Sequence, residues 1–382
     1  MSPDVHQSAI ANTLPIVKGG ARQSVATVHS AAVSSDRTLG VLIVGNFLSG
    51  SVGTRGACEE LALHLNGLDR LRILTTSSKE RRLPRLADML ATIWRRRDEY
   101  DVAQVDVYSG PAFFWAEASC MLLRRIKKPY ILTLHGGNLP AFSHGQPDRV
   151  RRLLQTGRVV TTPSEYLGDQ MSPYRADLRL LPNALDLKSY AFRLRTQPRP
   201  ALVWLRAFHE IYNPEMGPKV VQLLARDFPG LTMSMIGPDK RDGSRQRTQQ
   251  IATDLGVMDR MTFPGGVRKT ETPGWLDKGD IFLNTPNVDN MPVSVLEAMA
   301  SGLCVISTNV GGVPYLLKDE QDALLVPANS PEAMAAAVSR ILTEPGLAGR
   351  LSQNARAKSE KYDWNVVLPQ WETLLRSVAG NA

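Results

Sequence analysis

Short apolar runs alternate with helical patterns along the chain, and this alternation occurs in two successive series. The first series begins with Val-Leu-Ile-Val at residues 41–44, an unbroken apolar run that is closed by Gly45. A run of this kind indicates a strand that is buried on both faces of a sheet. Repeated alternation of strands and helices predicts parallel sheets covered by helices.

The two series predict two doubly wound domains of similar size. Strands are expected at 41–44, 71–74, 102–107, 130–134, 159–162, 178–181, 202–205, 231–236, 261–263, 281–283, 304–307 and 323–326. Helices are expected at 57–65, 86–94, 112–123, 218–225, 249–255, 293–300 and 331–342, and two further helical patterns complete the chain. The predicted organisation is a flexible tail (1–36), a first domain (37–190), a linker (191–200), a second domain (201–362) and a last helix (about 363–380) that packs back on the first domain. The linker is assigned from its polar residues and its closing prolines, Pro198 and Pro200.

Composition excludes several classes of protein. With 382 residues, 43% of them hydrophobic and 21% charged, the chain is neither a disordered nor a polytopic membrane protein, and it is long enough for two domains with their own cores. Cys58, Cys120 and Cys304 form no CxxC pair, which favours a reducing cytosol over a disulfide framework or a zinc site. Residues 1–36 lack the apolar core of a signal peptide.

The chain is basic, and its excess charge is unevenly distributed. Forty-five Lys and Arg residues against 37 Asp and Glu residues give a formal net charge of +8. Basic clusters stand at 81–85, 95–97 and 124–128, all in the first half of the chain. One interpretation is solvated helix ends, and the other is a face for an anionic partner such as a membrane surface, a lipid-linked phosphate or a polyanion. Nucleic acid is not expected, because aromatic residues are only 6% and do not interleave with these clusters.

The segment 287–302 carries the clearest sign of an anion site. It follows a predicted buried strand, Asp289 or Asn290 can cap the helix that comes next, and Pro292 suits its first turn. Free amides would then belong to Met291, Val293 and Ser294. Such amides, at the positive end of a helix dipole, bind anions such as a pyrophosphate.

Glu297 lies one turn further into this helix. A carboxylate at that place can accept hydrogen bonds from two neighbouring hydroxyls, such as those of a ribose. The alternative is a capped core helix whose Glu297 merely faces solvent, and the residues alone do not decide between the two.

Two loops that follow strands of the first series are further candidates, because ligands bind beyond the carboxyl ends of strands in such sheets. His135 follows the strand 130–134 and precedes two glycines; the alternative is a loop histidine that is bonded to backbone. The glycine-rich loop 50–56, which contains Gly53, has the wrong spacing for the dinucleotide fingerprint and by itself indicates only a turn.

An ordered set of motifs resembles the retaining GT-B glycosyltransferases of family four. Asp289 and Glu297, separated by seven residues, resemble the Glu-x7-Glu signature of that family. The other similar segments are 181–186, 236–238, 263–265, 275–282, 298–302 and 308–314. The set extends from about Leu39 to about Trp371, nearly the whole predicted fold. The resemblance implies an α/β GT-B fold, in which two Rossmann-like doubly wound domains face a central cleft.

The resemblance also implies roles for individual residues. Asp289 and His135 stand at the positions that contact the transferred sugar and are the expected catalytic residues. Arg206 matches the arginine that neutralises the donor pyrophosphate, and Glu297 matches the residue that holds the ribose. The remaining expected donor-binding residues are Gly53, Asn290, Met291, Pro292 and Val293.

The activity implied by the resemblance is transfer of a hexose-type sugar, with retention, from a nucleotide-diphosphate sugar to a glycan or lipid-linked acceptor. No metal and no cofactor other than this donor substrate are expected. The setting would be synthesis of a surface or exported polysaccharide, in the cytoplasm or at the inner face of the membrane. The alternatives are a non-catalytic subunit that binds sugar nucleotides and a nucleotide-sugar epimerase or hydrolase on the same fold.

The sequence departs from the family pattern at three places, one of which is Tyr315, where many relatives have glutamate. Asp289 is one methylene shorter than the usual glutamate, which changes its reach. The lysine that usually follows the arginine by about five residues, as a second clamp on the pyrophosphate, is missing after Arg206. Tyr212, Asn213 or His209 are expected to donate hydrogen bonds in its place.

Overall fold

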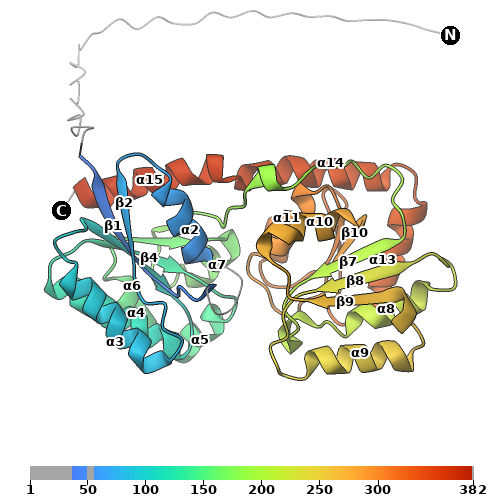
Figure 1. Cartoon of the computed structure of the whole chain (residues 1–382), viewed down its shortest axis with the longest axis horizontal. Helices are drawn as coiled ribbons and strands as arrows, with labels where there is room; N and C mark the ends of the chain where they lie inside the picture. Colours follow the sequence, from blue (N-terminus) through green and yellow to red (C-terminus); the bar gives the residue numbers. More distant parts are fainter. Residues whose placement is uncertain (1–36, 50–55, 381–382) are drawn as a thin grey trace, which may run out of the picture. The chain divides into compact units, whose positions relative to one another are not determined.

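The computed structural model describes residues 37–49 and 56–380, which contain two six-stranded parallel sheets (Figure 1). We call residues 37–190 the N-terminal half and residues 191–362 the C-terminal half. The strands of the first sheet are β1 (Leu39–Val44), β2 (Leu71–Thr75), β3 (Val102–Val107), β4 (Tyr130–Leu134), β5 (Val159–Thr162) and β6 (Leu178–Leu180). Those of the second are β7 (Ala201–Leu205), β8 (Thr232–Ile236), β9 (Met261–Gly265), β10 (Ile281–Asn284), β11 (Cys304–Thr308) and β12 (Leu324–Val326). The predicted fold class, α/β with two doubly wound domains, is confirmed.

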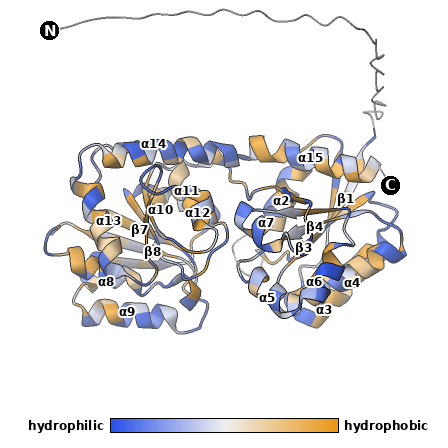
Figure 2. Ribbon diagram, turned by 180° about the vertical axis from the view of Figure 1, so that it is seen from behind, coloured by the Kyte–Doolittle hydropathy of each residue, from blue (hydrophilic) through white to orange (hydrophobic). Residues whose placement is uncertain are grey.

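Helices cover both faces of the first sheet (Figure 2). They are α2 (Ala57–Asn66), α3 (Arg82–Arg95), α4 (Pro111–Arg125), α5 (Leu139–Gly145), α6 (Pro147–Leu154) and α7 (Glu165–Met171). On one face, Met89 of α3 and Phe113 of α4 share a core with Val105. On the other face lies α15 (Trp364–Gly380), whose buried Trp371 shares a core with Val41. The last helix therefore packs on the N-terminal half, although the chain reaches it from the C-terminal half.

The second sheet is covered in the same way. Its helices are α8 (Met216–Leu224), α9 (Ser244–Asp254), α10 (Thr272–Asp277), α11 (Val293–Ala300), α12 (Val313–Leu316), α13 (Pro331–Thr343) and α14 (Leu347–Ser359). Short 3-10 turns are η1 (Leu187–Ser189), η2 (Glu210–Tyr212), η3 (Met258–Arg260), η4 (Lys269–Glu271) and η5 (Glu360–Tyr362). Every residue of α11 from Ser294 to Ala300 is buried, so this helix belongs to the core and presents only its first turn and one edge to a ligand.

Strand order shows where ligands can bind. The first sheet has the order β2-β1-β3-β4-β5-β6 and the second the order β12-β11-β10-β7-β8-β9. The second is the order of dinucleotide-binding domains. In each sheet the strand order reverses at one point, between β1 and β3 and between β7 and β10, and ligands bind beyond the carboxyl ends of the strands at such points.

The segment 191–200, expected to be a polar linker, is bound to the C-terminal half. Arg193, Arg195 and Arg199 converge on the carboxylate of Asp280, at 2.7, 3.4 and 2.9 Å. Asp280 is 1% exposed, and Arg195 is also fully buried. The polar sequence therefore reflects an ion-pair cluster in which Arg195 and Asp280 are buried, whereas Arg193 and Arg199 reach the same carboxylate from the exposed surface.

The short helices α5, α6, α7, α10 and α12 were missing from the sequence prediction. Elements of one or two turns contain too few residues to show a helical period. The predicted elements differ from their expected bounds by at most about five residues, and α11, although it is short, agrees completely. Among the described residues, no helix combines the length and the apolar character that crossing a bilayer requires.

Candidate active site

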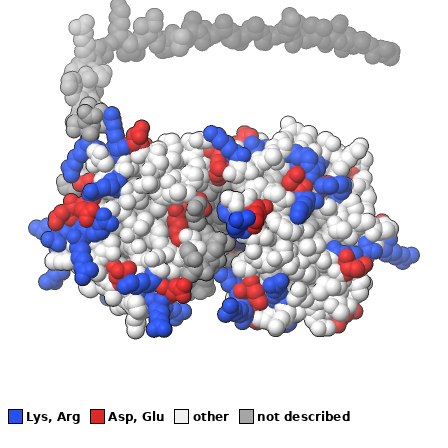
Figure 3. All heavy atoms as spheres, in the orientation of Figure 1, with Lys and Arg blue, Asp and Glu red and all other residues white. Residues whose placement is uncertain are grey.

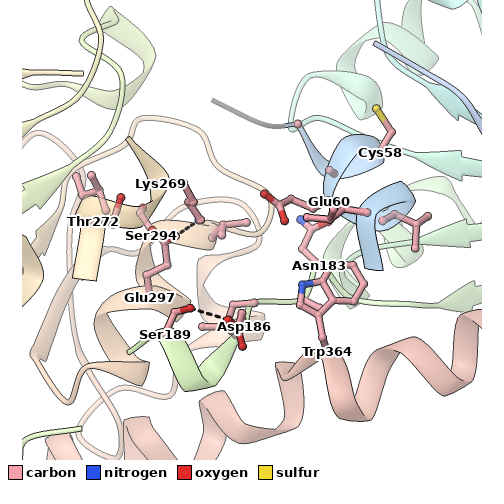
Figure 4. A pocket seen from close by; sticks show the side chains of 18 of the residues that line it. Cys58, Glu60, Asn183, Asp186, Ser189, Lys269, Thr272, Ser294, Glu297 and Trp364 are labelled. Carbon is pink, nitrogen blue, oxygen red and sulfur yellow. Dashed lines mark hydrogen bonds and ion pairs between the residues drawn. The ribbon is translucent and has the colours of Figure 1, made fainter. Parts of the chain in front are cut away.

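A cavity of about 800 Å³ lies where loops of the two halves meet (Figure 4). Its wall on the N-terminal side includes Cys58, Glu60, Asp106 and His135. Its wall on the C-terminal side includes Arg206, Lys240, Lys269, Ser294 and Glu297. Figure 4 shows Lys269 and Glu297 facing the cavity from one side, Glu60 from the other, and Trp364 rising from α15. Both switch points of the sheets therefore open on this cavity.

Arg206 comes directly after β7, and its amide donates to Ile236 O at 3.0 Å. Its guanidinium lies 4.5 Å from the centre of the Tyr212 ring and forms an ion pair with Asp289. Burial lowers the pKa of Arg206 from its usual value, since the charged form loses its water. The buried Nε of this guanidinium has no hydrogen-bond partner among the described residues, so it retains a donor for a ligand.

Asp289 is held in a loop whose backbone is tightly packed. Its Oδ1 accepts from the amide of Asn290 at 2.9 Å, and its carbonyl accepts from the amide of Gly312 at 3.0 Å. The Asn290 side chain is bonded to Ser164 Oγ of the N-terminal half. Helix α11 begins only at Val293, so the expectation that Asp289 or Asn290 caps it is wrong. Both polar side chains are engaged elsewhere, one by Arg206 and the other by Ser164.

Glu297 is 4% exposed, so the alternative in which it faces solvent is wrong. Its Oε1 accepts a hydrogen bond from Tyr190 Oη at 2.8 Å and is also paired with Lys269. Burial, and then the neighbouring carboxylate, raise the pKa of Tyr190, so this hydroxyl stays a donor. One turn before Glu297, the Ser294 Oγ is buried without a hydrogen-bond partner among the described residues.

The imidazole ring of His135 bonds to a carboxylate and not to the backbone of any described residue. Its Nε2 lies 2.9 Å from Asp106 Oδ1, an oxygen that also accepts from Gln104 Nε2 at 2.8 Å. The Tyr108 ring stacks on the imidazole, with centroids 4.9 Å apart and planes 18° apart. The carboxylate, the amide and the stacked ring fix the plane of the imidazole at the edge of the cavity.

The structure brings some of the predicted residues together and separates others. His135, Arg206, Val293 and Glu297 line the cavity, whereas Asp289 does not line it and lies behind Arg206, with which it is paired. Asn290 and Met291 line a smaller cavity of about 70 Å³ instead. Pro292 occupies the capping position of α11. Gly53, like the predicted tail 1–36, lies outside the described residues.

The residues expected to replace the missing lysine are used in other ways. The Tyr212 ring packs against the Arg206 guanidinium. The Asn213 amide donates to Asn329 Oδ1 at 2.9 Å, and the His209 ring accepts from a neighbouring amide at 3.2 Å. The further cations of the cavity come from residues that the sequence analysis did not single out, Lys240 and Lys269.

Asp106, Tyr190 and Lys269 are the site residues that sequence reasoning missed. Asp106 did leave a signal, because Gln104 and Asp106 are polar residues two apart in an otherwise apolar strand, and so share one face. Tyr190 and Lys269 lie in irregular segments, 107 and 28 residues from Glu297 in sequence, where no periodicity points to a partner.

The fold is that of the GT-B glycosyltransferases. Sucrose-phosphate synthase from Thermosynechococcus elongatus superposes with a TM-score of 0.75 and 16% identity, over 90% of this chain and 100% of the other. HepE from Anabaena, solved in complex with UDP-glucose, gives a TM-score of 0.71 at 16% identity, over 88% of this chain and 99% of its own. At this identity the likeness concerns the fold alone.

Residues 195–358, less than half of the chain, match the family described as "Glycosyl transferases group 1". It is 25% identical over 200 residues to a D-inositol 3-phosphate glycosyltransferase of Streptomyces bingchenggensis, covering 52% of this chain and 41% of the relative. It is 23% identical over 309 residues to a phosphatidyl-myo-inositol mannosyltransferase of Mycobacterium tuberculosis, covering 75% of this chain and 76% of the relative. The match therefore spans less than half of the first relative and about three quarters of the second.

Proposed function

We propose that this chain is a retaining glycosyltransferase that moves a hexose-type sugar from a nucleotide-diphosphate donor to a glycan or lipid-linked acceptor. The observation that carries this proposal is the convergence of Arg206, Glu297 and His135 on one cavity at the switch points of both sheets. The match of residues 195–358 to the group 1 family supports it, as do relatives named for glycosyl transfer to inositol phosphate and phosphatidyl-inositol.

The donor is proposed to lie along the C-terminal wall of the cavity. Arg206 neutralises the pyrophosphate, together with the amides of the first turn of α11, and Glu297 accepts the ribose hydroxyls. Lys240 lines the same cavity, on the loop after β8, and supplies positive charge that the missing lysine would otherwise give. Stabilising the departing diphosphate is the main electrostatic task of such a reaction.

Transfer is proposed to occur on one face of the sugar and without a metal. The acceptor oxygen bonds to the anomeric carbon as the bond to the diphosphate oxygen breaks, and a donor phosphate oxygen takes the acceptor proton. His135 and Asp289 orient the sugar while positive charge develops on its ring. Asp106 holds the imidazole of His135 and so acts as a positioning residue. We place this reaction in the cytoplasm or at the inner face of the membrane, in synthesis of a surface or exported polysaccharide.

A thermal-shift screen of UDP-, GDP-, ADP- and dTDP-sugars tests the donor. A ligand at 100 times its Kd stabilises the native state by about 2.7 kcal/mol, which is expected to raise Tm by several degrees. The donor found is then incubated with and without acceptors, and its products are identified. Binding without turnover would identify a non-catalytic subunit, and a changed sugar without acceptor an epimerase or hydrolase. A screen in which no nucleotide sugar shifts Tm would refute the proposal.

Glu297→Gln is expected to weaken donor binding by about 10- to 100-fold, because a hydrogen bond to a charged group contributes roughly 1.5–3 kcal/mol. Isothermal titration calorimetry with the identified donor measures the change in Kd. Tyr190→Phe is the matched control, since it removes only the hydrogen bond to Glu297 and leaves the carboxylate in place. An unchanged Kd for Glu297→Gln would rule out the ribose contact.

A further inference from the structure

The four most exposed large apolar side chains of the described residues lie on two neighbouring helices. Leu83 and Trp94 of α3 are 81% and 50% exposed, and Phe114 and Met121 of α4 are 54% and 63% exposed. Single exposed apolar residues are common on protein surfaces, but a group of this size on one face marks an interaction site.

These side chains form two stripes on the outer sides of the helices. Met89 and Ile93 of α3 point to the core, whereas Leu83 and Trp94, three turns apart, share the opposite side. Phe114 and Met121 are two turns apart on α4 and are likewise turned from its buried residues. The helices pack against each other, and Arg85 of α3 lies 5.3 Å from the centre of the Trp115 ring.

Positive charge surrounds both stripes. Arginines at positions 81, 82, 95, 124 and 125 form no ion pair or side-chain hydrogen bond with any other residue of the described ranges 37–49 and 56–380. Arg149, by contrast, is neutralised by Glu117. Figure 3 shows Lys and Arg along the outer side of the N-terminal half, with Asp and Glu among them. An uncompensated basic fringe around apolar side chains is typical of helices that lie in the interface of a bilayer.

We propose that the α3–α4 face, formed by Leu83, Trp94, Phe114, Met121 and these five arginines, docks the protein on an anionic lipid bilayer. The apolar side chains would enter the boundary between headgroups and acyl chains, and the arginines would contact anionic headgroups. Charge complementarity selects this partner over an uncharged surface. The apolar stripes select it over a free polyanion, which offers nothing to bury them.

One end of this face, with Arg81, Arg82, Leu83 and Phe114, lies toward the sheet edge on which the cavity opens, and the other end, with Trp94, Met121 and the arginines at 95, 124 and 125, lies at the opposite edge. Helices α3 and α4 follow the parallel strands β2 and β3, so they begin at the edge of the sheet that carries His135. Arg85 of α3 donates from Nη1 to Asn46 Oδ1, at 3.1 Å, in the loop after β1. The use of the α3–α4 face to present a lipid-linked acceptor rests on the proposed function, but the docking of this face on a bilayer does not.

Vesicle sedimentation of the full chain tests the docking. The protein is expected to bind phosphatidylcholine vesicles that contain phosphatidylglycerol, to bind pure phosphatidylcholine far more weakly, and to be released by salt. Arg124→Ala with Arg125→Ala is expected to lower the partition coefficient roughly twenty-fivefold, because each arginine near the surface contributes roughly fivefold. The control is Leu223→Ser with Arg226→Ala, an exposed leucine and arginine at the end of α8 in the C-terminal half.

A second readout reports insertion directly. Brominated lipids are expected to quench the tryptophan fluorescence, and Trp94→Phe is expected to remove most of this quenching. Equal binding to neutral vesicles, or full binding by the arginine variant, would overturn the proposal. So would a dimer that Leu83→Ser dissociates, because a second copy would then cover the face. The donor-induced rise in Tm is expected to survive in all these variants, which separates failure of docking from failure of the proposed function.

Discussion

Replacing Arg206 with alanine is expected to lower kcat/KM about a thousandfold with the identified donor. The guanidinium lies in the cavity at the switch point of the second sheet, where the diphosphate is proposed to leave. Loss of one preorganised donor to a developing anion costs about 10²–10³ in rate, and here a full positive charge is lost as well. The substitution also leaves the carboxylate of Asp289, 11% exposed, without its cationic partner.

Arg206→Lys separates charge from shape. Lysine keeps the charge but cannot form the planar contact with the Tyr212 ring or donate from two nitrogens at once. An intermediate loss of activity is therefore expected. Arg268→Ala is the matched control, because this exposed arginine precedes Lys269 and is paired with Glu271 outside the cavity wall. Initial rates at varied donor concentration measure the effect, and a loss below threefold for Arg206→Ala would exclude it from the reaction.

The sequence is sufficient to predict those features that depend on neighbouring residues along the chain. Apolar runs such as that of β4 identify buried strands without knowledge of their partners, and strand–helix alternation implies parallel pairing. Because functional groups follow the carboxyl ends of such strands, His135 and Arg206 could be located before their contacts were known.

Features that depend on sheet register and on irregular segments could not be predicted. Asp106 meets His135 because β3 and β4 pair in a register that places Asp106 opposite Thr133, two residues before His135. The pair of Lys269 with Glu297 joins a 3-10 turn to a core helix. Asp289 could either cap α11 or pair with a cation. It pairs with Arg206, which lies 83 residues earlier in the sequence, and no local pattern reveals a partner at that distance.

Gly312→Ala is expected to destabilise the protein by about 2–4 kcal/mol and to abolish measurable donor binding. A Cβ at Gly312 would lie 1.9 Å from the carbonyl oxygen of Asn290. That oxygen belongs to backbone, so no side-chain rotation can relieve the overlap, and the loop that carries Asp289 must move. The movement would break the hydrogen bond from the Gly312 amide to Asp289 O and shift the carboxylate from Arg206.

Gly274→Ala is the matched control for this substitution. Gly274 lies inside α10, and a Cβ there would meet no heavy atom within 4 Å. Alanine is favoured over glycine within a helix, so this variant is expected to be unchanged or up to about 1 kcal/mol more stable. Urea denaturation measures both stabilities, and calorimetry with the donor measures binding. A Gly312→Ala protein with native stability and native donor affinity would show that the close approach of these two loops does not hold the site together.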